Sequence, residues 1–176
     1  VYDKTESHLG YASDAVHLLT ILAENDVVDS LDYDQMTESF YSLMSINSQI
    51  SGIFLGDPGG NFIMSSRYHN DNPDGYMTKK VLIDSSGNRQ VLKYYYDSSR
   101  NLEYVVDVTD SDPYDPRTRP WFSLSIESNE AVWTSPYLFF TAQEPGITTS
   151  KAIRNSDQSL HAVVGGGGPV AGRGGD

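Results

Sequence analysis

The spacing of apolar residues predicts two helices in the first quarter of the chain. Over residues 8–24 the apolar side chains recur at steps of three and four, the repeat of one helix face. A second helix is predicted over residues 34–44, with Asp32 or Asp34 as its N-terminal cap. Both helices are therefore expected to bury one side.

After residue 50 the pattern changes to short apolar runs separated by turn-forming residues. The runs 50–55 and 62–65 flank a turn rich in Gly and Pro and predict a hairpin, and 81–83 and 91–96 predict another. A short helix is expected to begin near Thr118. Further strands are predicted at 104–108, 131–140, 147–154 and 160–164. Helices followed by hairpin-linked strands are typical of an α+β domain with an antiparallel sheet.

The charge of the chain excludes several partners. It has 24 acidic and 12 basic residues, and a net charge of −12. Such a surface repels nucleic-acid phosphates and anionic lipid, so no nucleic-acid role is expected. The absence of cysteine removes disulfides and thiolate chemistry. No apolar run approaches the roughly 18 residues that span a membrane.

The end of the chain differs from the rest in composition. Residues 166–176 are rich in glycine and have no apolar repeat. We expect them to be a linker or a remnant of cloning, which leaves residues 1–165 as a single domain taken from a larger protein.

No motif of catalysis or of cofactor binding is present. The histidines are scattered, and no nucleophile elbow, phosphate loop or zinc-binding helix motif occurs. Four aspartates cluster within nine residues, but the spacing lacks the Gly and the closing Glu of a calcium loop. We therefore expect no enzyme activity, no metal and no cofactor. These aspartates are Asp107, Asp110, Asp112 and Asp115.

Two arginines lie among aromatic residues in this acidic chain. Residues 114–122 read YDPRTRPWF, and WTSPY follows at 133–137. The rigid fork of an arginine suits a carboxylate, and Trp and Tyr offer flat apolar walls with one polar group each. Together they could line a small-ligand pocket. They could also be structural, with an arginine paired to a nearby aspartate and the tryptophans in the core.

These two motifs resemble those of the double Cache (PDC-type) extracytoplasmic sensor domains of bacterial and archaeal membrane receptors. The resemblance covers most of the chain and implies the membrane-distal module of that fold. In it a long N-terminal helix packs on a curved antiparallel sheet of PAS-like shape. The concave face of the sheet and its covering loops form the ligand pocket.

One branch of this family binds amino acids, and its motif can be placed on the chain. The resemblance implies that Arg119 holds the ligand carboxylate. Tyr114, Trp121 and Tyr137 match its aromatic positions. Phe122 stands where the motif usually has tyrosine, so one hydroxyl is missing.

Other parts of the predicted site follow from the same resemblance. Asp115 is expected to orient Arg117 or Arg119, and both Asp115 and Arg117 are candidate ligand contacts. Residues 67–76 and 94–96 are expected to complete the lid and floor. The motif has an aspartate after the last strand for the ligand ammonium, whereas residues 165–168 here are glycine. The expected ligand is thus an amino acid or a small organic acid.

The resemblance implies a non-catalytic sensor that relays ligand occupancy through its N-terminal helix to an output such as a histidine kinase or a chemoreceptor. The helix is also a candidate homodimer contact; the other interpretation is that its apolar side packs wholly against the sheet. The full-length protein is expected to be membrane-anchored. Two alternatives remain open. One is an unliganded structural or dimerising module, and the other is a secreted β module that stacks carbohydrate on Trp121 or Trp133.

Overall fold

Two helices precede the strands. The computed structural model describes residues 2–67 and 74–169. Helix α1 spans Tyr2–Glu24 and α2 spans Tyr33–Ile46. The Asp32 carboxylate caps α2, since it accepts from the backbone N–H groups of Asp34 and Gln35 at 3.1 and 3.0 Å. Across this described part of the chain, no helix has both the length and the apolar character needed to cross a bilayer.

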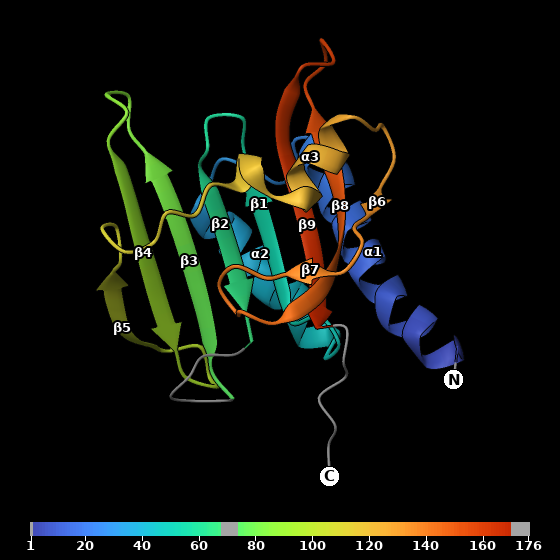
Figure 1. Ribbon diagram of the computed structural model, residues 1–176, viewed down its shortest axis with the longest axis horizontal. Helices are drawn as coiled ribbons and strands as arrows, with labels where there is room; N and C mark the ends of the chain where they lie inside the picture. Colours follow the sequence, from blue (N-terminus) through green and yellow to red (C-terminus); the bar gives the residue numbers. More distant parts are fainter. Residues whose placement is uncertain (1, 68–73, 170–176) are drawn as a thin grey trace.

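One antiparallel sheet forms the centre of the molecule (Figure 1). Within the described residues it has nine strands in the order β5-β4-β3-β2-β1-β9-β8-β6, and β7 also pairs with β8. The hairpins expected from the sequence are its β1–β2 and β3–β4 pairs. The strands are β1 (Gly52–Gly56), β2 (Phe62–Ser66), β3 (Tyr76–Ile83), β4 (Arg89–Tyr96), β5 (Leu102–Asp107), β6 (Val132–Trp133), β7 (Tyr137–Leu138), β8 (Pro145–Arg154) and β9 (Leu160–Pro169).

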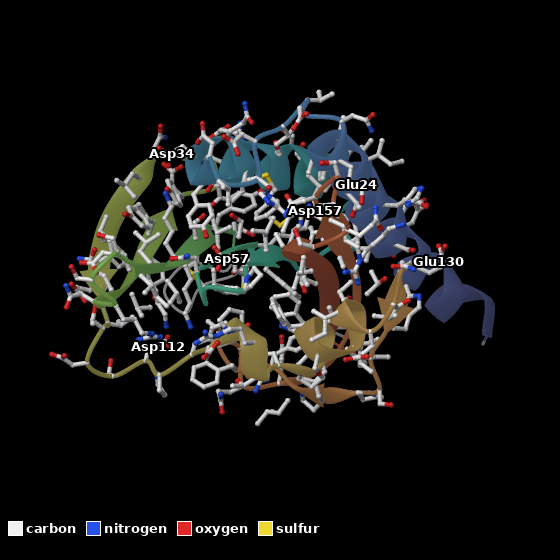
Figure 2. The ribbon with its side chains drawn as sticks, turned by 90° about the horizontal axis from the view of Figure 1, so that it is seen from above. Glu24, Asp34, Asp57, Asp112, Glu130 and Asp157 are labelled. Carbon is white, nitrogen blue, oxygen red and sulfur yellow. The ribbon has the colours of Figure 1, made fainter. Side chains whose placement is uncertain are left out.

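The two faces of the sheet are covered by different elements (Figure 2). Helices α1 and α2 pack on one face, α1 against β8 and β9 and α2 against β1 and β2. Residues of β1, β2, β8 and β9 that point to this face form an apolar core with the helices. Its fully buried members include Val16, Leu19, Phe40, Met44, Ile53, Leu55, Ile63 and Val164. This arrangement confirms the predicted α+β fold.

The second face of the sheet is covered by residues 114–122, the motif predicted to line a ligand pocket. The chain crosses it through the 3₁₀ turn η1 (Pro116–Thr118) and the short helix α3 (Pro120–Ile126). Pro120 occupies the first helical position, where its missing N–H costs nothing. Trp121 and Phe122 are buried and pack with Phe54, Phe62 and other residues in a second apolar cluster.

Two expectations from the sequence were wrong in detail. The predicted strand 131–140 is two short strands, because Pro136 between them has no N–H for the ladder. Strand β9 continues to Pro169, so residues 166–169 belong to the fold and are not a tail. Two positions of β9 leave no room for a side chain. A Cβ at Gly165 would lie 2.3 Å from the Phe54 ring, and one at Gly167 would lie 2.2 Å from the Ile147 carbonyl oxygen. Residues 170–176 lie outside the described residues.

Candidate ligand-binding pocket

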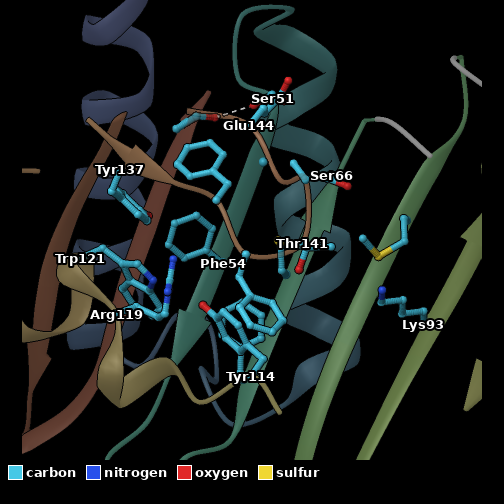
Figure 3. Close-up of a pocket in the computed structure, with 18 of the residues that line it drawn as sticks. Ser51, Phe54, Ser66, Lys93, Tyr114, Arg119, Trp121, Tyr137, Thr141 and Glu144 are labelled. Atoms are coloured by element: carbon cyan, nitrogen blue, oxygen red, sulfur yellow. Dashed lines mark hydrogen bonds between the residues drawn. The ribbon is translucent and has the colours of Figure 1, made fainter. Parts of the chain in front are cut away.

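A cavity of about 200 Å³ lies on the α3 side of the sheet (Figure 3). Residues that face one another across neighbouring strands form its floor. One cross-strand row runs through Gly167, Gly52, Ser66, Met77 and Tyr95. A second cross-strand row lies two residues along each strand from the first. Its members Phe54, Met64 and Lys93 also line the cavity. Of residues 94–96, which were expected to contribute to the floor, Tyr95 lines the cavity.

The turn that follows β7 covers the cavity, and we call residues 139–144 the lid. The backbone closes it, because the Phe139 N–H donates to the Glu144 carbonyl and the Gln143 N–H donates to the Phe139 carbonyl, each at 2.9 Å. The lid residues that line the cavity are Phe139, Phe140, Thr141, Ala142 and Glu144. The sequence placed the lid at 67–76 instead, a segment whose residues 68–73 lie outside the described part.

Arg119 is the residue just before α3, and it lines the cavity. Its guanidinium carbon lies 5.5 Å from the centre of the Tyr137 ring and 5.9 Å from that of Phe140, within the range of cation–π attraction. One amino group, Nη2, donates to the Leu138 carbonyl at 2.8 Å. No carboxylate within residues 2–67 and 74–169 forms an ion pair with Arg119. Most of its N–H donors are thus available to a ligand.

Three aromatic side chains complete this end of the cavity. Trp121 is only 1% exposed, and its ring centre lies 4.8 Å from that of Phe54. The ring centre of Tyr114 lies 4.5 Å from that of Phe62, and the Tyr137 hydroxyl bonds Thr148 Oγ1 at 2.8 Å. Burial raises the pKa of both tyrosine hydroxyls, so they stay neutral and can act as donors.

The structure therefore brings together four of the seven predicted site residues, Tyr114, Arg119, Trp121 and Tyr137, on one cavity. The other three lie outside it. Asp115 binds Arg117, with Oδ2 and Nη2 at 2.8 Å, and so it orients this arginine and not Arg119. Phe122 follows Trp121 on α3, and since successive helix residues point about 100° apart, it packs beside Trp121 away from the cavity.

Comparison with known proteins identifies the family of this chain. Residues 62–167 match the family model described as methyl-accepting chemotaxis protein-like, first PDC sensor domain. The chain belongs to this family.

Solved structures share the fold of this PDC sensor domain. The ligand-binding domain of the Campylobacter jejuni chemoreceptor Tlp3, in complex with L-valine, has a TM-score of 0.57 at 16% identity, over 96% of this chain and 53% of that one. The ligand-binding domain of the amino acid chemoreceptor PctC of Pseudomonas aeruginosa PAO1, in complex with GABA, has a TM-score of 0.56 at 18% identity, over 92% and 55%. The chain thus spans about half the length of these structures.

One curated relative is a cyclase. Adenylate cyclase 1 of Rhizobium meliloti (strain 1021) is 22% identical to the PDC sensor domain over 137 residues. The match covers 78% of this chain but only 18% of the cyclase. The similarity therefore concerns one part of that longer protein.

A buried ion pair that no sequence motif predicts lies behind the lid of this PDC sensor domain. The Lys79 ammonium lies 2.6 Å from Oδ2 of Asp112, 4.4 Å from the centre of the Tyr114 ring and 3.4 Å from Thr141 Oγ1. Burial lowers the pKa of Lys79 to about 8, and the bond and charge of Asp112 oppose this shift. Asp112, from the aspartate cluster, thus holds a lysine in place at the cavity wall.

Proposed function

We propose that this PDC sensor domain binds a small ligand through its carboxylate, with Arg119 as the anchor. The observation that carries the proposal is the contrast between the two arginines of the motif. Arg117 is paired with Asp115, whereas Arg119 lines the cavity without a carboxylate partner in the described structure. A ligand carboxylate would form the charge-assisted pair that Arg119 lacks.

The walls of the cavity support a small, partly apolar ligand. Its aromatic rings offer apolar contact, while Arg119, Lys93 and a few hydroxyl groups provide polar contact. A volume of about 200 Å³ is on the scale of an amino acid or a small organic acid and not of a peptide. The similar domains of Tlp3 and PctC were solved with L-valine and GABA, which both carry a carboxylate.

We further propose an extracytoplasmic location and a signalling role in a membrane-anchored receptor, as in the chemoreceptors of this family. Helix α1 packs on β8 and β9, so it is placed to respond to changes at the pocket. A ligand that binds one arrangement of the domain more tightly would shift the population toward it. Tyr11, Leu18 and Ile21 are exposed on α1, and they are the candidate surface for a homodimer.

The carbohydrate alternative receives no support from the aromatic residues it would need. Stacking on a sugar requires an open ring face, and Trp121 is 1% exposed among Phe54, Phe62 and Phe122. Trp133 is 40% exposed but does not line the cavity.

Calorimetric titration with amino acids and small organic acids tests the carboxylate anchor. For the ligand that binds wild type best, Arg119→Ala should weaken binding by roughly 2–5 kcal/mol, the cost of removing one partner of an enclosed charge pair. Arg117→Ala is the matched control, because it removes the same charge two residues away and should leave affinity unchanged. Wild-type affinity in the Arg119→Ala variant would rule out the anchor.

A further inference from the structure

Glu144 places a negative charge at the end of the cavity away from Arg119. Figure 3 shows Glu144 and Ser51 toward one end and Arg119 and Tyr114 toward the other. Two glycines that pair across β1 and β9, Gly52 and Gly167, line the cavity too and leave that region free of side chains.

The carboxylate of Glu144 has no hydrogen bond or ion pair with any residue in the described ranges. Its backbone is nevertheless fixed, because its carbonyl accepts from the Phe139 N–H at 2.9 Å. Of the cavity-lining residues that the structure describes, Glu144 is the one acid. The side chain is half-buried, so its charge acts directly on what fills the cavity.

A ligand that fills the cavity removes water from this carboxylate. An apolar ligand end would leave Glu144 desolvated and unpaired, which is costly. An ammonium at the same place would replace the lost water by a charge-assisted hydrogen bond. The charges of the cavity ends thus favour a ligand that is itself charged at both ends.

We infer that Glu144 binds a ligand ammonium while Arg119 binds the carboxylate, so that the ligand is an amino acid whose two charged groups are separated by several bonds. The inference rests on the proposed function for its carboxylate end and adds the class of ligand. It favours ω-amino acids, or amino acids with a distal ammonium, over short α-amino acids whose charges adjoin.

Two ligand series measure this preference. The first is the unbranched ω-amino acids from glycine to 6-aminohexanoate, and the second is the unbranched carboxylates of matched length without the amine. Wild type should prefer a longer amino acid over its matched carboxylate by roughly 10- to 100-fold in affinity, the value of a hydrogen bond to a charged group. Glu144→Gln, which keeps the shape of the side chain, should abolish the preference while retaining carboxylate binding.

Glu130→Gln is the control, since it removes the same charge from an exposed acid outside the cavity and should keep the preference. Equal affinity of wild type for both series would overturn the inference alone, as would a Glu144→Gln variant that still prefers the amine. If glycine bound most tightly of the ω-amino acids, the inference would be wrong while the proposed function would stand. If wild type binds neither these series nor any other carboxylate, the proposed function fails and takes the inference with it.

Discussion

The ammonium of Lys79 lies 2.6 Å from the carboxylate of Asp112 inside the protein, with 0% and 8% of the two side chains exposed. The pair joins β3 to the chain segment that supplies the pocket aromatics, because Asp112 also accepts from the Tyr114 N–H at 3.0 Å. Lys79 in turn reaches Thr141 of the lid. A single ion pair thus connects the sheet, the wall and the lid of the cavity.

Breaking this pair from one side should destabilise the domain strongly. Lys79→Met removes the amine donor as well as the charge and leaves Asp112 buried without a partner, so urea unfolding should show a loss of about 3–5 kcal/mol. Deprotonation of Lys79 is a milder change, because the neutral amine can still donate to Asp112. Adding Asp112→Asn removes the unpaired charge and keeps an acceptor for the Tyr114 N–H, so the double variant should recover most of the loss.

The neighbouring lysine is a matched control for that experiment. Lys80 pairs with Asp34 at 2.8 Å, but 93% of the Asp34 side chain is exposed. Lys80→Met should therefore cost no more than about 1 kcal/mol. Equal losses at the two lysines would show that the Lys79 pair has no special role in stability.

The pH dependence of stability should reveal the same lysine. Its pKa is about 8 in the folded chain, against 10.5 for an unperturbed lysine. Between these values the unfolded state binds a proton that the folded state does not, so the free energy of unfolding should rise with pH. Below pH 8 both states hold the proton and this contribution is constant.

Urea unfolding at half-unit steps from pH 7 to pH 10 measures this slope, and its absence in the double variant of Lys79 and Asp112 assigns it. The series stops at pH 10 because buried tyrosines such as Tyr114, whose pKa is raised from 10.0, then act in the opposite direction. A wild-type profile no steeper than that of the double variant would contradict the assignment.

Two adjacent glycines of β9 should respond differently to the same change. A Cβ at Gly165 would lie 2.3 Å from the Phe54 ring, so Gly165→Ala should cost about 1–3 kcal/mol through overpacking. At Gly166 the nearest atom is Val16 Cγ2 at 3.5 Å, an ordinary contact, and Gly166→Ala should be neutral or slightly stabilising. Thermal unfolding of both variants checks the difference, and equal midpoints would disprove it.

How far the sequence predicts this domain depends on the range of the interactions involved. The helices and hairpins follow from local apolar spacing and turn residues, and they are found close to where they were expected. The glycine run of β9 has no side-chain pattern, and only pairing with β1 and β8 makes it a strand. No local signal could have shown those two partners.

The residues of the pocket also differ in whether local sequence can predict them. Tyr114, Arg119, Trp121 and Tyr137 lie within one short stretch, so a motif can identify them together. The floor residues come from separate strands and meet only once the register is set. Lys79 had a weak signal, since it alternates with Met77 and Val81 on β3, both buried, but its partner Asp112 lies far along the chain.

Successive residues of strand β8 point to opposite faces of the sheet and contact different parts of the molecule. Thr148 bonds the Tyr137 hydroxyl, and Ser150 accepts from Ser125 and donates to the Trp121 carbonyl. Further along, Ala152 packs in the cluster on the pocket face, and Ile153 packs in the cluster shared with α1. One strand thus has, on its two faces, residues that bond the pocket aromatics and a residue that packs in the core shared with α1. A displacement of β8 would therefore move the residues that support Tyr137 and Trp121 together with the surface on which α1 packs.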